Sequence, residues 1–248
     1  RKDGTVFNVD LKAIPCKQFE AQLDKQSAEE ILEDRHFHLI DNTTAYLRPG
    51  KFSNISRGSD DQNQDTWDKS EFCQFIDSAF LEINNKKSKN LILDLRDNPG
   101  GDNSFSDYMI AYFATKPFNI SSRFSKKVCQ RMKDLWKDKD SPELQDQKDQ
   151  IISLPNGHYF DLDIPDTHPH ANKSKRFDGN VYVLINRYSY SNAAYVAAII
   201  QDYNFGIIIG ENTSEEVSTF VPMSSFKLPN TKSTVIYPEG FAIRPSGD

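Results

Sequence analysis

Apolar residues between positions 66 and 83 recur every three or four residues, as Phe72, Phe75 and Ile76 illustrate. This spacing matches the 3.6-residue turn of an α-helix and predicts a helix with one face in a core. The preceding stretch, HFHLIDNTTAYLRPG at 36–50, offers two short strands. Residues 36–83 are therefore predicted to form strand, strand and helix in that order.

The stretch NLILDL at 90–95 is apolar without alternation, which is typical of a parallel strand covered on both faces. The turn Asp-Asn-Pro-Gly-Gly follows, and SFSDYMIAYFAT then resumes a helical pattern, with Ser104 or Ser106 available as its cap. A second unit repeats this order as strand VYVLI, turn NRYSYS, helix NAAYVAAIIQDY and strand FGIIIG. Such alternation predicts an α/β fold with a mostly parallel sheet flanked by helices.

Residues 117–180 interrupt this alternation with a stretch that is dense in charge and then rich in turn formers. We interpret them as an insertion over the core. A charged helical pair with a loop explains the composition, and a lid over a cleft is the alternative. Residues beyond 211 predict short strands and turns, and we expect the C-terminus to be truncated.

The composition limits the classes of function. With 37% hydrophobic residues in 248, the chain can form a substantial core. The net charge is −6 and lysines and arginines are scattered among acids, which argues against a nucleic-acid partner. No apolar run reaches the length of a membrane span. Cys16, Cys73 and Cys129 lack metal-ligand spacing, so we predict free thiols, with Cys73 as a small buried hydrophobe.

Two turns could carry chemistry: the Gly100-Gly101 pair after one strand and Ser191 after another. The carboxyl ends of neighbouring parallel strands share an edge, so the two turns could face each other. A serine at a helix start lies near free backbone amides that stabilise negative charge, although serine is also a common helix cap. The glycines are equally compatible with a plain turn or with amides exposed to an anion or carbonyl oxygen. Neither a phosphate loop nor a GxSxG elbow is present.

LILDLRDNPGG, followed by VYVLINRYSYSNAAYVAAIIQDYNFGIIIGENT, resembles the S41 serine peptidases, the group of carboxy-terminal processing proteases and the tricorn core protease. AYLRPGKF and FKLPNTKSTVIYPEGFAIRPSGD are similar to further segments of that family. The resemblance covers roughly 36–116 and 177–248.

The resemblance implies a crotonase-like α/β core that cleaves polypeptide substrates without a cofactor or metal. Ser191 matches the nucleophile. The Asn192 amide matches one donor of the oxyanion hole, and an amide of Gly100 or Gly101 matches the other. Losing one such donor typically costs about 2.7 to 4 kcal/mol of transition-state stabilisation.

The sequence departs from the family at the residue that would serve as the general base. Where Ser-Lys members carry lysine in a TFGKG stretch, this chain has TSEEV with Glu216 in its place, so a Ser-Lys dyad is not expected. Tricorn-like members use a histidine upstream and a glutamate near the closing motif, and both would fall outside this chain. Ala194 replaces the family's usual acid. We therefore predict that the longer protein is a serine peptidase and that these residues alone are inactive or nearly so.

The resemblance also implies a domain plan. Residues 1–15 resemble the tail of a PDZ-like domain, 16–35 form a linker or short helix, and 36–248 form the S41-like catalytic domain. Many bacterial members with this style of sequence resemble secreted or envelope proteins, which implies an extracytoplasmic location. The sequence does not give the oligomeric state.

No histidine offers an obvious replacement for the base. Alternation puts His36 and His38 on one strand face, where we expect them to be solvated. The other three histidines, His158, His168 and His170, lie in 117–180, where a polar loop is favoured over a His-x-His metal site. Two other functions stay open: a non-catalytic ligand- or peptide-binding protein on the same scaffold, and a plain α/β interaction domain.

Overall fold

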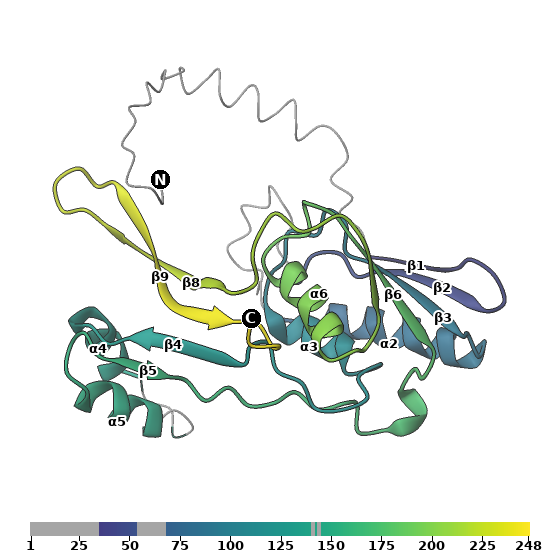
Figure 1. Ribbon diagram of the computed structural model, residues 1–248, viewed down its shortest axis with the longest axis horizontal. Coiled ribbons are helices and arrows are strands. Elements are labelled where there is room, and N and C mark those ends of the chain that lie inside the picture. The colour runs from purple at the N-terminus through teal and green to yellow at the C-terminus, as the bar shows by residue number, and fades with distance from the viewer. Residues whose placement is uncertain (1–34, 54–67, 140–141, 143–144) are drawn as a thin grey trace, which may run out of the picture. The chain divides into compact units, whose positions relative to one another are not determined.

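The computed structural model describes residues 35–53, 68–139, 142 and 145–248. The predictions for 1–15, and for 16–35 except its last residue, fall outside these residues. Two sheets are present in the described part (Figure 1). The first is five-stranded, and the second is four-stranded and antiparallel.

The five-stranded sheet has the order β1-β2-β3-β6-β7. Its strands are β1 (His36–Leu39), β2 (Thr44–Arg48), β3 (Asn90–Asp94), β6 (Asn180–Ile185) and β7 (Ile207–Gly210). Only β1 runs antiparallel to its neighbour, and the other pairs are parallel. The predicted mixed α/β architecture with a mostly parallel sheet is confirmed, whereas the crotonase-like assignment stays a prediction.

Three helices pack on one face of this sheet: α2 (Ser70–Asn85), α3 (Asn103–Ile110) and α6 (Asn192–Asp202). Their apolar side chains form one buried cluster with Leu91, Leu93, Val181 and Val183. The predicted amphipathic helix is thus confirmed as α2, because its buried residues are those at helical spacing.

Two predictions about this region are wrong. β3 is not fully covered on both faces, because Leu91 and Leu93 are buried while Ile92 between them is only half-buried. All three helices lie on the side of Leu91 and Leu93, so Asn90 and Ile92 on the other side keep some solvent contact, although Asp94 at the end of the strand is buried. The cap of α3 is neither Ser104 nor Ser106 but Asp102, whose carboxylate accepts from the Ser104 amide at 2.8 Å.

The four-stranded sheet has the order β5-β4-β9-β8. Its strands are β4 (Arg123–Lys127), β5 (Tyr159–Asp161), β8 (Thr219–Lys227) and β9 (Thr234–Ile243). The last two form a long hairpin where the sequence predicted short strands. Residues 117–180 contain β4, α4 (Gln130–Lys137), α5 (Gln145–Ser153), β5 and the 3₁₀ turn η2 (Lys173–Lys175). Part of this segment therefore pairs with β9 rather than forming only a helical pair and a loop.

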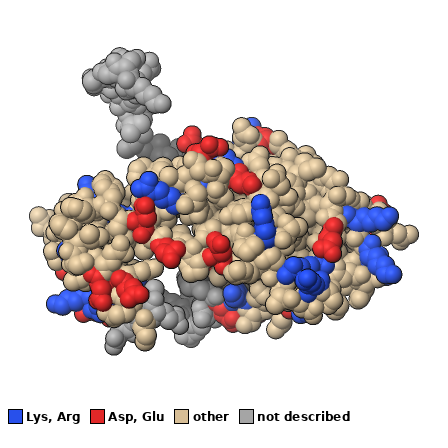
Figure 2. All heavy atoms as spheres, turned by 60° about the horizontal axis from the view of Figure 1, so that its bottom comes forward, with Lys and Arg blue, Asp and Glu red and all other residues tan. Residues whose placement is uncertain are grey.

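The surface shows no continuous stripe of one charge on the face in Figure 2, where basic and acidic side chains are interspersed. Within the residues that the structure describes, no helix is long and apolar enough to cross a bilayer. Cys73 is half-buried and Cys129 exposed, and neither forms a disulfide. Burial raises the pKa of the Cys73 thiol.

Candidate active site

Ser191 and Gly100 lie in contact where the ends of β3 and β6 meet. A side-chain carbon added to Gly100 would stand 2.8 Å from the Ser191 Cβ and 2.7 Å from the Asn192 nitrogen. Real side-chain carbons are not found so close, so only glycine fits here, and its φ of +89° is also one that glycine adopts easily. The structure thus brings together three of the residues singled out in the sequence.

Gly101 fills a second tight position. It pairs with Phe52 in a parallel bridge, and a side-chain carbon on it would stand 2.2 Å from the Phe52 oxygen. The Phe52 amide donates to the Gly100 oxygen, and the Asp102 amide donates to the Phe52 oxygen, each at 2.9 Å. The two glycines are therefore fixed by backbone contacts on both sides.

Ser191 occupies the N-cap position of α6 but does not act as its cap. Its side chain makes no capping hydrogen bond, and its backbone has φ of 51° and ψ of −125°, a conformation rare for a residue with a side chain. Among the described residues the Ser191 hydroxyl has no hydrogen-bond partner. The plain helix-cap interpretation therefore does not explain this serine.

The amides around Ser191 differ in their availability. The Gly100 amide donates to the Asn98 Oδ1 at 2.9 Å and is thus occupied. The amides of Gly101 and Asn192 have no acceptor in the described part of the chain. Asn192 opens α6, so its amide also belongs to the positive end of the helix dipole. These two amides are free to bind an oxygen with developing negative charge.

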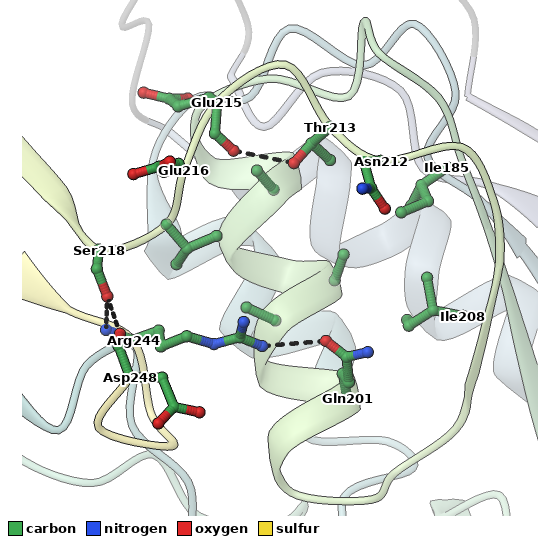
Figure 3. Close-up of a pocket in the computed structure, with 14 residues that line it drawn as sticks. Ile185, Gln201, Ile208, Asn212, Thr213, Glu215, Glu216, Ser218, Arg244 and Asp248 are labelled. Atoms are coloured by element: carbon green, nitrogen blue, oxygen red, sulfur yellow. Dashed lines mark hydrogen bonds between the residues drawn. The ribbon is translucent and has the colours of Figure 1, made fainter.

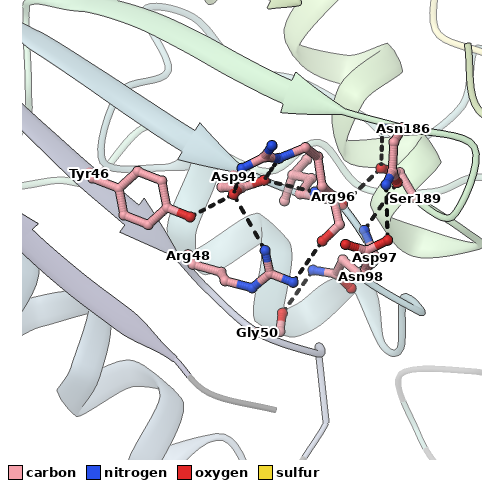
Figure 4. A network of polar contacts seen from close by, with 10 residues as sticks. Tyr46, Arg48, Gly50, Asp94, Arg96, Asp97, Asn98, Asn186 and Ser189 are labelled. Atoms are coloured by element: carbon pink, nitrogen blue, oxygen red, sulfur yellow. Dashed lines mark hydrogen bonds and ion pairs between the residues drawn. The ribbon is translucent and has the colours of Figure 1, made fainter. Parts of the chain in front are cut away.

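Asn98 holds the two turns together. It is 4% exposed, and its Nδ2 donates to the Gly50 oxygen at 2.8 Å (Figure 4). Its Oδ1 accepts from Gly100, and its backbone oxygen accepts from the Tyr190 amide at 2.9 Å. Two of these bonds fix Gly100 relative to the turn before Ser191, and the third ties both to the loop at Gly50. In the sequence this residue is only one member of the turn Asp-Asn-Pro-Gly-Gly.

A second set of contacts ties the same turns. Asp97 and Asn186 exchange hydrogen bonds, and the Ser189 hydroxyl donates to the Leu95 oxygen at 2.8 Å (Figure 4). Ser189 is fully buried. Because both turns follow adjacent parallel strands, these short polar side chains can span the gap between them.

A charged cluster fixes the end of β3. The buried Asp94 carboxylate accepts from the hydroxyl of Tyr46 at 2.5 Å and from Arg96 at 2.8 and 2.9 Å, and Arg48 lies 3.4 Å away (Figure 4). Burial by itself would raise the pKa of Asp94, but the hydrogen bonds from Arg96 and Tyr46 outweigh it and lower this pKa below its ordinary value. Asp94 is therefore a charged anchor at the base of the Gly100 loop.

Glu215 is the acid that reaches Ser191. Its Oε2 accepts from the Ser191 amide at 2.6 Å, whereas Glu216, which the family pattern singled out, is exposed. Glu215 also lies near Tyr195, whose hydroxyl is buried without a partner in the described residues. Burial, and then the charge of Glu215, raise the pKa of Tyr195 to about 12, so this phenol stays neutral. The sequence marked this acidic pair only because Glu216 stands where Ser-Lys members carry lysine, and no local pattern singled out Glu215 for the contact with Ser191.

The histidines lie elsewhere. His36 and His38 share the same exposed strand face, as expected, with 3.0 Å between Nε2 of one and Nδ1 of the other. None of the five histidines, all of which are in the described ranges, hydrogen-bonds to Ser191. No group of three or more His, Cys, Asp or Glu side chains in these ranges is arranged to hold a metal.

Similarity to known proteins identifies the family of this chain. The sequence model of peptidase family S41 matches residues 44–248. The chain belongs to peptidase family S41. The resemblance inferred from LILDLRDNPGG and the Ser191 segment is therefore confirmed at the level of the family.

Individual S41 relatives are distant. The tail-specific protease of Haemophilus influenzae is 26% identical over 138 residues, which is 56% of this chain and 15% of that protein. The structure of mature CPAF complexed with lactacystin has a TM-score of 0.58 at 14% identity, and that of mature CPAF has 0.56 at 16%. Each match covers 83% of this chain and 44% of CPAF. At such identities the solved structures show a shared fold, and the chain spans less than half the length of these relatives.

Proposed function

We propose that this chain carries the nucleophile and oxyanion hole of an S41-type serine endopeptidase. Ser191 attacks the carbonyl carbon of a peptide bond, and the amides of Asn192 and Gly101 hold the resulting oxyanion. The observation that carries the proposal is the contact between Gly100 and Ser191. Beside it lie the unoccupied amides of Gly101 and Asn192 and a Ser191 hydroxyl that makes no capping hydrogen bond. The Gly100 amide is occupied by Asn98, so the role of Gly100 is to let the backbone of its loop lie close to Ser191.

The general base is proposed to come from outside these 248 residues. A serine hydroxyl needs a partner that removes its proton, and no histidine is bonded to Ser191. Glu215 contacts the Ser191 backbone amide rather than its hydroxyl. We therefore expect this chain alone to be inactive or nearly so.

Labelling with a serine-directed fluorophosphonate tests both parts. A version of the protein extended at both ends should label rapidly at one site, and Ser191→Ala should abolish this labelling. Ser78→Ala, which removes an exposed hydroxyl on α2, serves as the matched control and should label normally. Rapid labelling of the 248 residues alone would show that the base lies within them, and an extended protein that never labels would refute the peptidase.

The glycine loop gives a second test. Gly100→Ala forces a side chain against Ser191 and Asn192, so labelling in the extended protein should fall by about 100-fold or more, the usual effect of losing an oxyanion donor. Gly157→Ala is the control, because Gly157 also has a positive φ but has open space around it. Equal labelling of both variants would contradict the role assigned to the loop that contains Gly100.

A non-catalytic peptide-binding protein is the second candidate. It is favoured by Glu215, whose negative charge lies beside the amides that would have to stabilise an oxyanion. On this alternative the extended protein binds peptides but neither labels nor cleaves them. The same labelling experiment therefore separates the two functions.

We also propose an extracytoplasmic location, on the strength of the family resemblance. Fractionation of cells that express the whole protein would test it, with recovery from the envelope or medium as the expected result. Recovery from the cytoplasm would contradict it.

A further inference from the structure

A cavity of about 490 Å³ runs along α6 (Figure 3), the helix that Ser191 immediately precedes. Ala194, Ala197 and Ala198 form the wall on the helix, at the three- and four-residue spacing that places them on one face. Ile185 and Ile208 from the sheet also line it. These residues give the cavity an apolar side on which the small alanine side chains leave the space open, while Asn212, Thr213 and Ser218 add polar groups elsewhere.

One end of the cavity lies next to Ser191. Glu215 and Glu216 lie at the N-terminal end of α6, and Gln201 lies at the other end (Figure 3). Glu215 both lines the cavity and accepts from the Ser191 amide at 2.6 Å. A peptide with its carbonyl at Ser191 would thus have the adjoining side chain at the mouth of this cavity.

The charges on the cavity are unbalanced. Its lining contains the acids Glu215, Glu216 and Asp248 and the base Arg244. The positive charge of Arg244 is already paired, because Arg244 donates to both carboxylate oxygens of Asp202 at 2.6 and 3.0 Å. A further bond to the Gln201 Oε1 at 3.0 Å holds it against the helix. The cavity therefore retains an excess of negative charge.

We propose that this cavity is the specificity pocket of the enzyme and that it takes a lysine or arginine side chain. The apolar side formed by the alanines of α6, Ile185 and Ile208 suits the methylene stem, and Glu215 and Glu216 suit the cationic head. The inference rests on the proposed function, since it assigns the cavity to the residue whose carbonyl Ser191 attacks. A cation there would also neutralise Glu215, the charge that otherwise opposes an oxyanion.

Peptide binding tests the pocket without relying on turnover. Three fluorescein-labelled hexapeptides, identical except for lysine, norleucine or glutamate at the fourth of six positions with alanine elsewhere, are titrated into the 248-residue chain and followed by anisotropy. We expect the lysine peptide to bind about tenfold more tightly than the norleucine peptide, the sum of two partly exposed ion pairs, and the glutamate peptide to bind most weakly. The preference should shrink with added salt.

Substitutions locate the effect. Glu216→Gln replaces an exposed side chain, so it should keep the fold and lower the lysine preference severalfold, and Glu215→Gln should lower it further. Glu82→Gln removes an acid from the surface of α2, where it pairs with Lys86, and should leave the preference unchanged. The proposed specificity would be refuted by equal affinities for the three peptides, by absence of binding, or by an equal loss of the lysine preference in Glu82→Gln.

The outcome is separable from that of the proposed function. If Ser191 is labelled in the extended protein but no lysine preference is found, the proposed peptidase function is supported and the proposed specificity pocket is refuted. A lysine preference that depends on Glu215 and Glu216, in a protein that never labels, would retain a cation-binding cavity and refute the peptidase.

Discussion

The two sheets contain the same kind of ion pair in opposite surroundings. In the five-stranded sheet the Asp94 side chain is fully buried, with Arg48 10% exposed. In the four-stranded sheet Asp161 is 51% exposed and its partner Arg123 57%. The buried pair anchors the loop that leads to Gly100, whereas the exposed pair joins two strands at the surface. Burial, more than geometry, should decide what each pair contributes.

The cores differ in the same way. The five-stranded sheet packs against α2, α3 and α6 through a large buried cluster, whereas the buried cluster formed with α4, α5 and β5 contains four residues, Val128, Met132, Ile151 and Phe160. The hairpin of the second sheet also exposes large apolar side chains such as Ile236 and Met223. The region that holds the candidate site is thus the more deeply packed one, as a site that needs fixed geometry requires.

Replacing Asp94 should have the largest effect on stability. Asp94→Ala leaves Arg48 without its partner in a buried place, so the free energy of unfolding should fall by about 3 kcal/mol. Because the pKa of Asp94 is lowered in the folded state, its contribution is complete above the ordinary value of 3.8 and is lost as the pH falls through the lowered value. Urea denaturation at pH 7 and in acid should show the gap to wild type narrowing in acid. A loss below about 1 kcal/mol at pH 7, as for an exposed pair, would remove the contrast between the sheets.

Asp107 on α3 should show the opposite dependence on pH. Burial raises its pKa to about 6, with weaker opposing hydrogen bonds from Asn103 and Thr167. The folded state therefore keeps a proton that the unfolded state releases, and this group costs stability as the pH rises from 4 to 6. Asp107→Asn removes that cost, so its stability relative to wild type should improve by about 2 kcal/mol between pH 4 and pH 7. Urea denaturation at the two pH values measures it, and parallel pH profiles would contradict it.

Replacing Asp161 should matter much less than replacing Asp94. Asp161→Ala removes an exposed pair with Arg123 and should cost about 0.5 kcal/mol. The same urea experiment with the two variants side by side gives the ratio directly. A cost near that of Asp94→Ala would mean that the second sheet depends on its surface pair, and the comparison would have to be reversed.

The smallest effect is expected on the hairpin. Ile236 is 68% exposed on β9, so Ile236→Thr should change the free energy of unfolding by less than about 0.5 kcal/mol. Leu93→Ala in the fully buried core of the first sheet is the contrasting control and should cost about 3 kcal/mol. Thermal denaturation of both variants would check this pair. A large loss in Ile236→Thr would show that this exposed side chain is covered in solution.

Local sequence patterns predicted the elements around the site. The spacing of Phe72 and Ile76 gave α2, and the repeated strand-turn-helix order gave the parallel sheet. These patterns work because a helix or strand exposes its side chains at a fixed period. The same logic failed for β3, whose unbroken apolar run predicted two covered faces, because the number of helices on each face depends on where they pack.

Part of the geometry of the candidate site was predicted. The proximity of Gly100 and Ser191 followed from the rule that neighbouring parallel strands end at one edge. Asn98, with its bonds to Gly50, Gly100 and Tyr190, and Glu215, with its bond to the Ser191 amide, could not be chosen from their neighbours in the chain. Each role depends on a segment that arrives from elsewhere in the sequence.

The sequence by itself determined the family, the order of strands and helices in the five-stranded sheet, and the glycines and serine at their ends. Only the tertiary structure decided that the Gly100 amide is occupied, that Glu215 rather than Glu216 reaches Ser191, and that alanines of α6 open a cavity beside it. The reason is physical: periodicity and turn preference act over a few neighbouring residues, whereas a hydrogen bond or a cavity depends on the packing of distant segments to within a fraction of an ångström.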